Sequence, residues 1–550
     1  MVDIIKSLLK EALFRAYISL SKSDVDKLIF SVELQGNPLY GDFSTNLAFQ
    51  LASILKEKPY KIASEIVKNI NSEFIDNVEI KGGGFINIFV KASFFQKFLR
   101  DFLQDENKLI SQLGDGKKIQ VEFVSANPTG PLHIGHGRGA GFGDSIARIL
   151  DILGYKVTKE YYINDRGNQI INLGKSIYYW YMLHFGKSVI FPEDGYKGEY
   201  VKIIAEKLIH DCKDELVNLD ETLAISRCAE YGKKQIMENI NQDLHSFNVY
   251  FDKYFSETDL FENNYVDETL NLLKNKGMAY KKDEALWLKT TAFGDDKDRV
   301  LIKSTGEYTY FASDIAYHRN KFERGFDVII DVWGADHHGY VNRMKAALQA
   351  LGYDSNKLKV VLIQMVNLIK KGEKVSMSTR ANEFIPLSWL IKEVGKDAAR
   401  FFYCLRSPDS HFDFNIDLAK EKSSDNPVYY IQYAYARIKS LFRNACEKNI
   451  IYQELENLEL LALKEELNLI KNIQAYFETL INASILLEPN KLAIFLIELA
   501  SNFHYYYNNT KIVDEGNIDL TNARLNLCNS IGRIIQSGLN LLGVDAPERM

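Results

Sequence analysis

Two histidines, His133 and His136, stand three positions apart in the segment A-N-P-T-G-P-L-H-I-G-H, residues 126–136. This spacing puts both side chains on the same side of a first helical turn. Unpaired backbone N–H groups and the helix dipole favour a phosphate at that place. The two imidazoles therefore predict a site for the phosphates of a nucleotide.

The residues around the histidines suit close approach of a ligand. Pro128, Gly130 and Pro131 predict a rigid loop before the helix. Glycines within a helix cost roughly 0.5–1 kcal/mol each relative to alanine. The segment nevertheless continues with Gly135, Gly137, Gly139 and Gly141. We expect these glycines to let a flat adenine reach the backbone.

The elements that position this loop read as a nucleotide-binding sheet. Residues 118–126 form a β-rich run, a helix is expected over about 135–153, and a strand over 156–164. Strand–loop–helix–strand is typical of a parallel sheet with right-handed crossovers. Strand patterns return at 299–303, 308–312, 327–333 and 360–366, and residues 168–295 are interpreted as a mostly helical insertion. The pattern predicts an α/β Rossmann-type sheet split by that insertion.

Different patterns flank this region. Residues 2–20 predict a helix, 46–70 a helical region interrupted near Pro59, and 78–90 two strands around a glycine turn. Helical patterns fill the chain from about 385, and the polar stretch 407–415 precedes a bundle-like region. We predict a small α+β domain over 1–108, a catalytic domain over 109–400 and an all-α bundle over 401–550.

Composition restricts the class of protein. A chain of 550 residues exceeds one hydrophobic core, which favours two to four domains. No apolar run approaches the roughly 20 residues that span a bilayer. The first residues form an amphipathic pattern, whereas a secretory signal has an unbroken apolar stretch. We expect a cytoplasmic protein with no membrane partner.

Cysteine usage and net charge add two expectations. The five cysteines are scattered without a C-x-x-C pair, which fits a reducing compartment and disfavours structural zinc, so no metal site is predicted. The net charge of −6 does not exclude RNA binding, because phosphate binding needs only a local basic face.

The histidine segment resembles the HIGH signature of class I aminoacyl-tRNA synthetases. The wider phrase V-E-F-V-S-A-N-P-T-G-P-L-H-I-G-H (121–136) is similar to arginyl-tRNA synthetases in particular. Further likenesses in the same order are G-D-F-S-T-N (41–46), G-G-G-F-I-N (82–87), Y-Y-I-N-D-R-G-N-Q (161–169), Y-T-Y-F-A-S-D-I-A-Y-H (308–318) and A-P-E-R-M (546–550). The resemblance therefore extends over nearly the whole chain.

This resemblance implies two adjoining subsites. It assigns catalytic roles to His133, His136 and Arg380. It assigns contacts with ATP to Pro128, Gly130, His133, Gly135, His136, Gly334, Asp336, Met377 and Ser378. Asp336 would accept from the ribose hydroxyls, whereas His337 and His338 have no assigned role. The implied arginine pocket consists of Glu122, Ser125, Asn127, Tyr310 and Asp314. A guanidinium offers five planar donors and needs carboxylates and neutral acceptors, and such a pocket rejects lysine.

One signature departs from the family pattern. Class I enzymes carry Lys-Met-Ser-Lys-Ser on a loop whose lysines neutralise pyrophosphate, but here Ser376-Met377-Ser378-Thr379-Arg380 replaces it, in a loop spanning about 370–384. Both lysines are absent. Arg380 is our first choice for the missing cation, and Lys371 and Lys374 are the alternatives.

The ends of the chain carry the implied tRNA contacts. The helical bundle resembles an anticodon-binding domain, with Tyr433 and Arg437 suited to stacking on unpaired bases. Tyrosine packing in the core is the alternative explanation for most of the aromatic residues. The first domain resembles one that contacts the tRNA elbow, with Asn37 and Phe43 as candidates.

The resemblance implies ligation of L-arginine to its cognate tRNA through an arginyl-adenylate, with ATP and Mg²⁺, by a monomer that does not bind DNA. Three alternatives stay open on the sequence: another class I synthetase, a catalytically silent tRNA-binding paralogue, and a nucleotidyl transferase resembling pantothenate synthetase. The last would not need the helical bundle.

Overall fold

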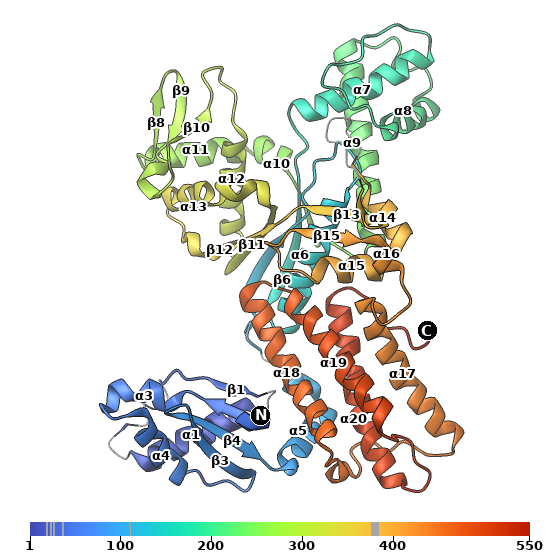
Figure 1. The fold of residues 1–550 in the computed structure, drawn as a ribbon. Coiled ribbons are helices and arrows are strands. Elements are labelled where there is room, and N and C mark those ends of the chain that lie inside the picture. The colour runs from blue at the N-terminus through green and yellow to red at the C-terminus, as the bar shows by residue number, and fades with distance from the viewer. Residues whose placement is uncertain (18–19, 22–24, 26–27, 36–37, 111, 376–383) are drawn as a thin grey trace.

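The computed structural model describes the chain except for residues 18–19, 22–24, 26–27, 36–37, 111 and 376–383. Figure 1 shows a small N-terminal domain and a helical bundle side by side, below a central sheet that carries two lobes. The predicted fold class is confirmed: along the chain, an α+β domain comes first, a parallel-sheet domain follows it, and an all-α bundle comes last.

The N-terminal domain packs helices on an antiparallel sheet of order β1-β2-β4-β3. Its elements are α1 (Val2–Ala16), β1 (Val32–Leu34), β2 (Phe43–Thr45), α3 (Leu47–Leu55), α4 (Pro59–Lys68), β3 (Ile75–Lys81) and β4 (Phe85–Val90). The predicted helix pair and the strands around the glycine turn are confirmed. Pro59 stands at the first position of α4, where its missing N–H has no helical partner to lose.

The central sheet has five parallel strands in the order β12-β11-β5-β6-β7. They are β5 (Lys118–Glu122), β6 (Lys156–Ile163), β7 (Lys253–Ser256), β11 (Val328–Gly334) and β12 (Leu358–Ile363), and α6 (Ile134–Ile152) connects β5 to β6. From β5 the chain first adds β6 and β7 on one side of it and later adds β11 and β12 on the other side. The direction in which strands are added therefore reverses between β5 and β11. Ligands of open α/β sheets bind at such a reversal, beyond the carboxyl ends of the strands.

The helical insertion is shorter than predicted. Helices α7 (Asn168–His184), α8 (Glu199–Cys212) and α9 (Glu221–Ser246) form it, but β7 then joins the central sheet beside β6. After α10 (Glu257–Glu262) and α11 (Tyr265–Asn275), the strands β8 (Ala279–Lys282), β9 (Ala285–Leu288) and β10 (Arg299–Ile302) form a separate antiparallel sheet. The predicted end of the insertion near residue 295 was wrong, because these short strands lack a clear periodicity. The strand predicted over 299–303 corresponds to β10, which is not part of the nucleotide-binding sheet.

The strand predicted over 308–312 is also wrong. Tyr308 makes only an isolated bridge to Ile302, and α12 (Tyr310–Glu323) begins two residues later. Its buried residues include Phe311 and Ile315, four apart, which is helical spacing. A five-residue aromatic run is too short to distinguish strand from helix. α13 (His338–Leu351) follows β11 and lies beside α12 in Figure 1.

The C-terminal part begins with a second small sheet. The strand predicted over 360–366 divides between β12 and β13 (Val366–Lys370), and β13 pairs with β14 (Glu373–Lys374) and with β15 (Phe412–Asn415), a strand in the expected polar break. Short helices α14 (Leu387–Val394), α15 (Lys396–Cys404) and α16 (Ile416–Lys420) surround it. The bundle consists of α17 (Pro427–Glu447), α18 (Lys464–Leu486), α19 (Asn490–Asn509) and α20 (Ile518–Leu541), with α5 (Ala92–Gln104) packed against it.

Glycines on α6 serve packing more than ligand approach. A Cβ at Gly137 would lie 2.5 Å from Leu387, and one at Gly143 would lie 2.4 Å from the Phe123 ring. A Cβ on Gly141 would meet Phe247. Of the four predicted glycines, Gly135 and Gly139 line the cavity described below, so the prediction that adenine approaches the backbone remains open for these two.

Alanine at Gly143 is expected to lower the free energy of unfolding by about 1–3 kcal/mol, because the methyl group overlaps the Phe123 ring in the core. Alanine at Gly139, on the same helix, meets no atom within 4 Å and should raise it by about 0.5–1 kcal/mol. Denaturant midpoints of the two variants provide the measurement. Equal midpoints would contradict the packing role of Gly143.

Candidate active site

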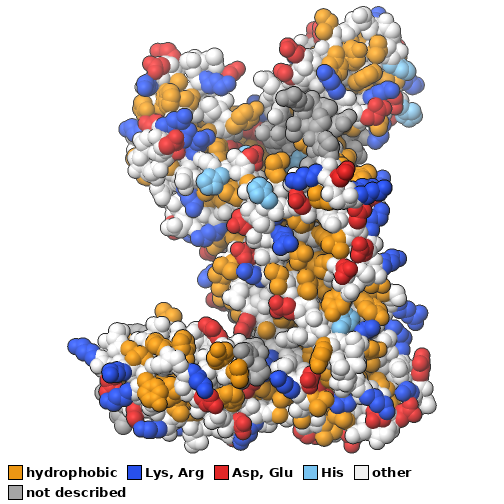
Figure 2. Space-filling model, viewed as in Figure 1, with side chains coloured by type: hydrophobic (Ala, Val, Ile, Leu, Met, Phe, Trp, Pro, Cys, Tyr) orange, Lys and Arg blue, Asp and Glu red, His pale blue; other side chains and the backbone are white. Residues whose placement is uncertain are grey.

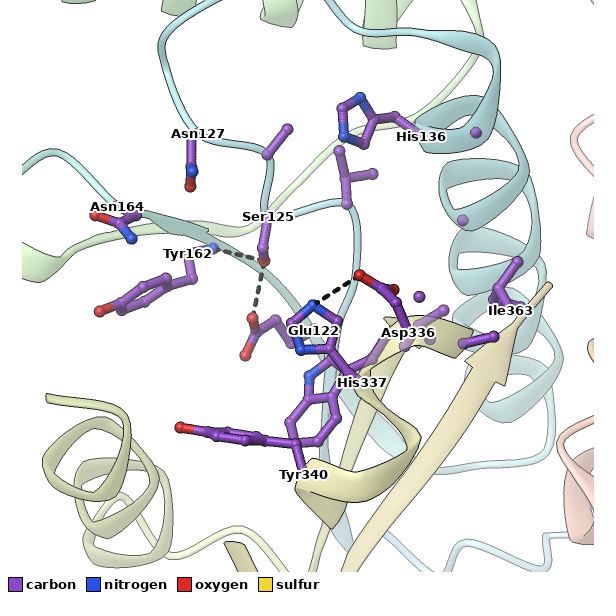
Figure 3. Close-up of a pocket in the computed structure, with 18 of the residues that line it drawn as sticks. Glu122, Ser125, Asn127, His136, Tyr162, Asn164, Asp336, His337, Tyr340 and Ile363 are labelled. Atoms are coloured by element: carbon purple, nitrogen blue, oxygen red, sulfur yellow. Dashed lines mark hydrogen bonds and ion pairs between the residues drawn. The ribbon is translucent and has the colours of Figure 1, made fainter. Parts of the chain in front are cut away.

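A cavity of about 900 Å³ opens at the carboxyl ends of β5 and β11, where the strand order reverses. Figure 3 shows Ser125, Asn127 and His136 on the side of the loop after β5, and His337 and Tyr340 on the side of α13. Histidine side chains border the hollow below the two upper lobes in Figure 2. The sheet therefore brings both predicted subsites to one place.

Most of the predicted ligand residues line this cavity. They are Glu122, Ser125, Asn127, His133, Gly135, His136, Tyr310, Asp314, Gly334 and Asp336. Pro128 and Gly130 do not: Pro128 is buried, and a Cβ on Gly130 would lie 3.3 Å from the Tyr200 hydroxyl of the helical insertion. These two residues shape the loop, and their assignment as ATP contacts stays a prediction.

The two histidines cap the helix that carries them. His133 Nδ1 accepts from the backbone N–H groups of Gly135 (3.1 Å) and His136 (3.3 Å), and His136 Nδ1 accepts from the N–H of His133 (3.2 Å). The rings stack with their centroids 3.6 Å apart. Because each Nδ1 is an acceptor, a neutral ring carries its proton on Nε2. The pair thus presents two Nε2–H donors at the N-terminus of α6.

Burial keeps both rings uncharged. It lowers the pKa of His136 to about 3, with a further contribution from His133, and it also lowers the pKa of His133. A neutral donor stabilises negative charge that grows on phosphate oxygens without itself requiring a counter-ion. Together with the helix dipole, the pair suits the oxygens of a phosphate under attack.

Glu122 belongs to a buried ion-pair network. Lys321 is fully buried and donates to Glu122 Oε2 and, at 2.7 Å, to Asp331 Oδ1. The hydroxyl of Ser125 donates to Glu122 Oε1 (2.8 Å) and accepts from the backbone N–H of Tyr162. Val124 and Ser125 have φ values of 68° and 39°, a left-handed turn that directs this hydroxyl.

Glu122, which the resemblance assigns to the arginine pocket, is therefore not a free carboxylate. Both of its oxygens already accept hydrogen bonds, and the Lys321 ammonium offsets its charge. Burial raises the pKa of Glu122, whereas Lys321 opposes the shift. For Lys321 burial alone would lower the pKa, but Asp331 and Glu122 raise it above its usual value. No motif or spacing in the sequence pointed to Lys321.

Asp314 is the carboxylate left for a cationic ligand. It lies one helical turn after Tyr310 on α12, and Tyr340 donates to its Oδ2. Among the described residues no lysine or arginine pairs with it. Burial raises the pKa of Asp314 and of Glu257, a buried neighbour whose own pKa the Asp314 carboxylate raises further. Such a site favours a cation that enters from outside.

The loop after β11 adds an exposed carboxylate to the cavity. Asp336 follows β11, its side chain is 82% exposed, and its Oδ2 lies 3.7 Å from His337 Nε2. A Cβ at Gly334 would lie 2.4 Å from Asp336 Oδ1, so only glycine leaves this carboxylate where it is. The loop after β11 thus presents an exposed acceptor pair beside the histidine donors.

A short antiparallel connection joins the histidine loop to the segment after residue 383. The N–H of Ile134 donates to Ile385 O (3.1 Å), and the N–H of Leu387 donates to Leu132 O (2.8 Å). Phe384 stacks on His133 with ring centroids 5.1 Å apart. The predicted Met377, Ser378 and Arg380 lie outside the described residues, and the segment that follows them contacts the phosphate end of the cavity.

The predicted nucleic-acid contacts differ in their exposure. On α17, Tyr433 is 37% exposed and the Arg437 guanidinium lies 4.5 Å from its ring centroid and 4.7 Å from that of Tyr507. Phe43 is completely buried in the core of the N-terminal domain, so its prediction as a tRNA contact was wrong. Asn37 lies outside the described residues.

The sheet topology and the paired histidines define a class of protein, the class I aminoacyl-tRNA synthetases. A family model described as "tRNA synthetases class I (R), catalytic domain" matches residues 98–403. Models for the arginyl tRNA synthetase N-terminal domain and the DALR anticodon binding domain match residues 3–90 and 431–550. The chain belongs to the arginyl-tRNA synthetase family.

Related sequences align with this chain over nearly their whole length. An arginine–tRNA ligase of Shouchella clausii is 46% identical over 533 residues, 96% of each chain. One from Bacillus licheniformis is 44% identical over 553 residues, 100% of this chain and 99% of that one. The fold matches a Thermus thermophilus arginyl-tRNA synthetase with a TM-score of 0.77 at 22% identity, covering 99% of this chain and all of that one.

Proposed function

We propose that the chain activates L-arginine with ATP and transfers it to the terminal ribose of its cognate tRNA. The observation that carries this proposal is a single cavity that two neutral Nε2–H donors and the Asp314 carboxylate line together. No lysine or arginine of the described residues forms an ion pair with Asp314. The arginine carboxylate attacks the α-phosphorus, a new O–P bond forms, and the bond to the β-phosphate oxygen breaks. Pyrophosphate leaves and arginyl-adenylate remains.

Catalysis in this scheme is positioning and charge stabilisation, since no side chain forms a covalent bond. His133 and His136 donate to oxygens on the reacting phosphorus, and the carboxylate of Asp336 accepts from the ribose hydroxyls. Arg380 is proposed to face the departing pyrophosphate. Mg²⁺ bound with ATP would supply positive charge that offsets part of the phosphate charge. In the described part of the chain no group of three His, Cys, Asp or Glu side chains is arranged to hold a metal.

Selectivity for arginine is proposed to come from the end of the cavity that Asp314 lines. Asp314 accepts from the guanidinium, Tyr310 borders the same wall from one turn away, and Asn127, itself donating to Gln169 at 2.6 Å, faces the amino-acid backbone. Lysine carries a point charge that leaves planar acceptors unmatched. Glu122 and Ser125 shape this end rather than supplying free acceptors.

The remaining assignments concern tRNA and the state of the protein. We place the anticodon at Tyr433 and Arg437, and the domain limits near residues 108 and 400. On the face drawn in Figure 2, basic and acidic side chains alternate without a dominant sign, so any tRNA-binding surface there is local. No helix in the described ranges is long and apolar enough to cross a membrane. We propose a cytoplasmic monomer that does not bind DNA.

Exchange of pyrophosphate into ATP is expected with arginine only after cognate tRNA is added. Arginine supports the reaction because it alone fills the Asp314 end, and lysine and ornithine should give none. Radiolabelled pyrophosphate incorporation measures the rate, with arginine omitted as the control. Exchange with another amino acid and none with arginine would contradict the specificity, and no exchange with any would indicate a silent paralogue.

A further inference from the structure

Asp314 is held by a neighbour that no sequence pattern singled out. Tyr340, in the first turn of α13, donates its hydroxyl to Asp314 Oδ2 on α12. We propose that Tyr340 is the positioning residue that aims the Asp314 carboxylate at the guanidinium of the substrate and preserves its charge. This inference rests on the proposed function, in which Asp314 binds that guanidinium.

The ring of Tyr340 is fixed on several sides. Phe311 and Trp333 approach it edge-on with centroid distances of 5.9 and 6.0 Å. The guanidinium of Arg343, one turn further along α13, lies 5.1 Å from its centroid. A ring enclosed in this way has little rotational freedom, so its hydroxyl holds one position. Figure 3 shows Tyr340 projecting into the cavity on the side opposite Asn127.

A tyrosine differs from a lysine as a partner for a carboxylate. Lys321 orients Glu122 but also offsets its charge, whereas the Tyr340 hydroxyl orients Asp314 and adds no positive charge. With Oδ2 occupied, Oδ1 is the oxygen left to face a ligand. Arg343 stacks on the tyrosine ring, and no ion pair joins it to Asp314 among the described residues. The carboxylate is thus directed by a neutral donor, which leaves its charge available to a cationic substrate.

Protonation of Asp314 gives this arrangement a measurable consequence. Burial raises the pKa of Asp314, and the hydrogen bond from Tyr340 opposes that rise. Loss of the hydroxyl therefore raises the pKa further, and arginine binding, which needs the anion, weakens at a higher pH than before. The other titratable groups that face this carboxylate are His318 and Lys321 of its own helix, His337 after β11, Glu257 of α10 and Tyr162 of β6. Both Tyr340→Phe and its control leave these groups in place.

The test compares Tyr340→Phe with Tyr308→Phe in the full chain. Tyr308 donates at 2.6 Å to Asp267, so the control removes the same kind of bond outside the cavity. Calorimetric titration with arginine across the pH range in which the protein stays folded should show about tenfold weaker binding for Tyr340→Phe near neutral pH. The pH at which affinity falls should rise by about one unit. The control should keep the parental profile, and ATP affinity should stay the same in both variants.

An unshifted profile for Tyr340→Phe would overturn the inference, as would an equal shift in the control. A double variant adds a second criterion: once Asp314→Asn has removed the carboxylate, Tyr340→Phe should cost arginine binding nothing more. Additive losses would assign Tyr340 a purely structural role. If Asp314→Asn alone leaves arginine affinity unchanged, the proposed function of Asp314 fails; if it weakens binding while Tyr340→Phe does not, only the present inference fails.

Discussion

Asp314→Asn is expected to weaken arginine binding about 30- to 4000-fold, because removing one partner of a desolvated charge pair costs about 2–5 kcal/mol. Asparagine keeps the shape of the side chain and can still accept from Tyr340, so the loss reports charge rather than packing. ATP affinity should change by less than about twofold, since the phosphate and ribose contacts lie at the other end of the cavity. Calorimetric titration of the full chain with each ligand provides the measurement.

The matched control for this change is Asp267→Asn. Asp267 also accepts a hydrogen bond from a tyrosine, Tyr308, but it lies outside the cavity. Arginine affinity in that variant should equal that of the parent. Parental arginine affinity in Asp314→Asn would contradict the assignment of Asp314 and return attention to Glu122, whose ion pair with Lys321 would then have to open on binding.

His136→Asn is expected to reduce the rate of adenylate formation about 100- to 1000-fold, the usual effect of removing one donor from a developing negative charge. Asparagine can still accept from the N–H of His133 and so keep the helix cap, but it lacks the Nε2–H donor. Arginine affinity should not change. Single-turnover formation of the adenylate, with tRNA present, measures this step.

His136→Gln separates the donor from the ring. Its side-chain amide reaches toward the position of Nε2, so we expect it to retain more than about a tenth of the parental rate. Comparable losses in the asparagine and glutamine variants, with arginine affinity unchanged, would show that the ring rather than its Nε2–H donor is required. A parental rate in His136→Asn would exclude the donor role altogether.

The histidine loop could be predicted from the sequence because its chemistry depends on neighbours within a few positions. His133, His136 and the helix that they cap lie in one short segment that follows a buried strand. Asp314 and Tyr310 were predicted from the family resemblance, although the segment that contains Tyr310 was predicted as a strand. The nucleotide end of the site could therefore be predicted because its residues are close together in the sequence.

The network around Glu122 could not be predicted in the same way. Lys321, on α12, is 199 positions away from Glu122; it reaches Glu122 beside Asp331, which the pairing of β11 with β5 places opposite Glu122. The same applies to Tyr340 and Asp314, which belong to different helices. Phe43 failed for a related reason: the pattern of a strand does not say which of its faces is covered, and here a helical layer buries it.

The separation of β5 and β11 along the chain also determines when the site can form during synthesis. β5 can pair with β6 soon after both emerge, but its other edge waits for β11, and Lys118 meets its partner Asp327 only 209 positions later. Contacts this distant close slowly. Until then Glu122 lacks its ammonium, and a hydrophobic strand edge is exposed to other nascent chains. The strand order that creates the binding cleft thus makes its assembly a late event on the ribosome.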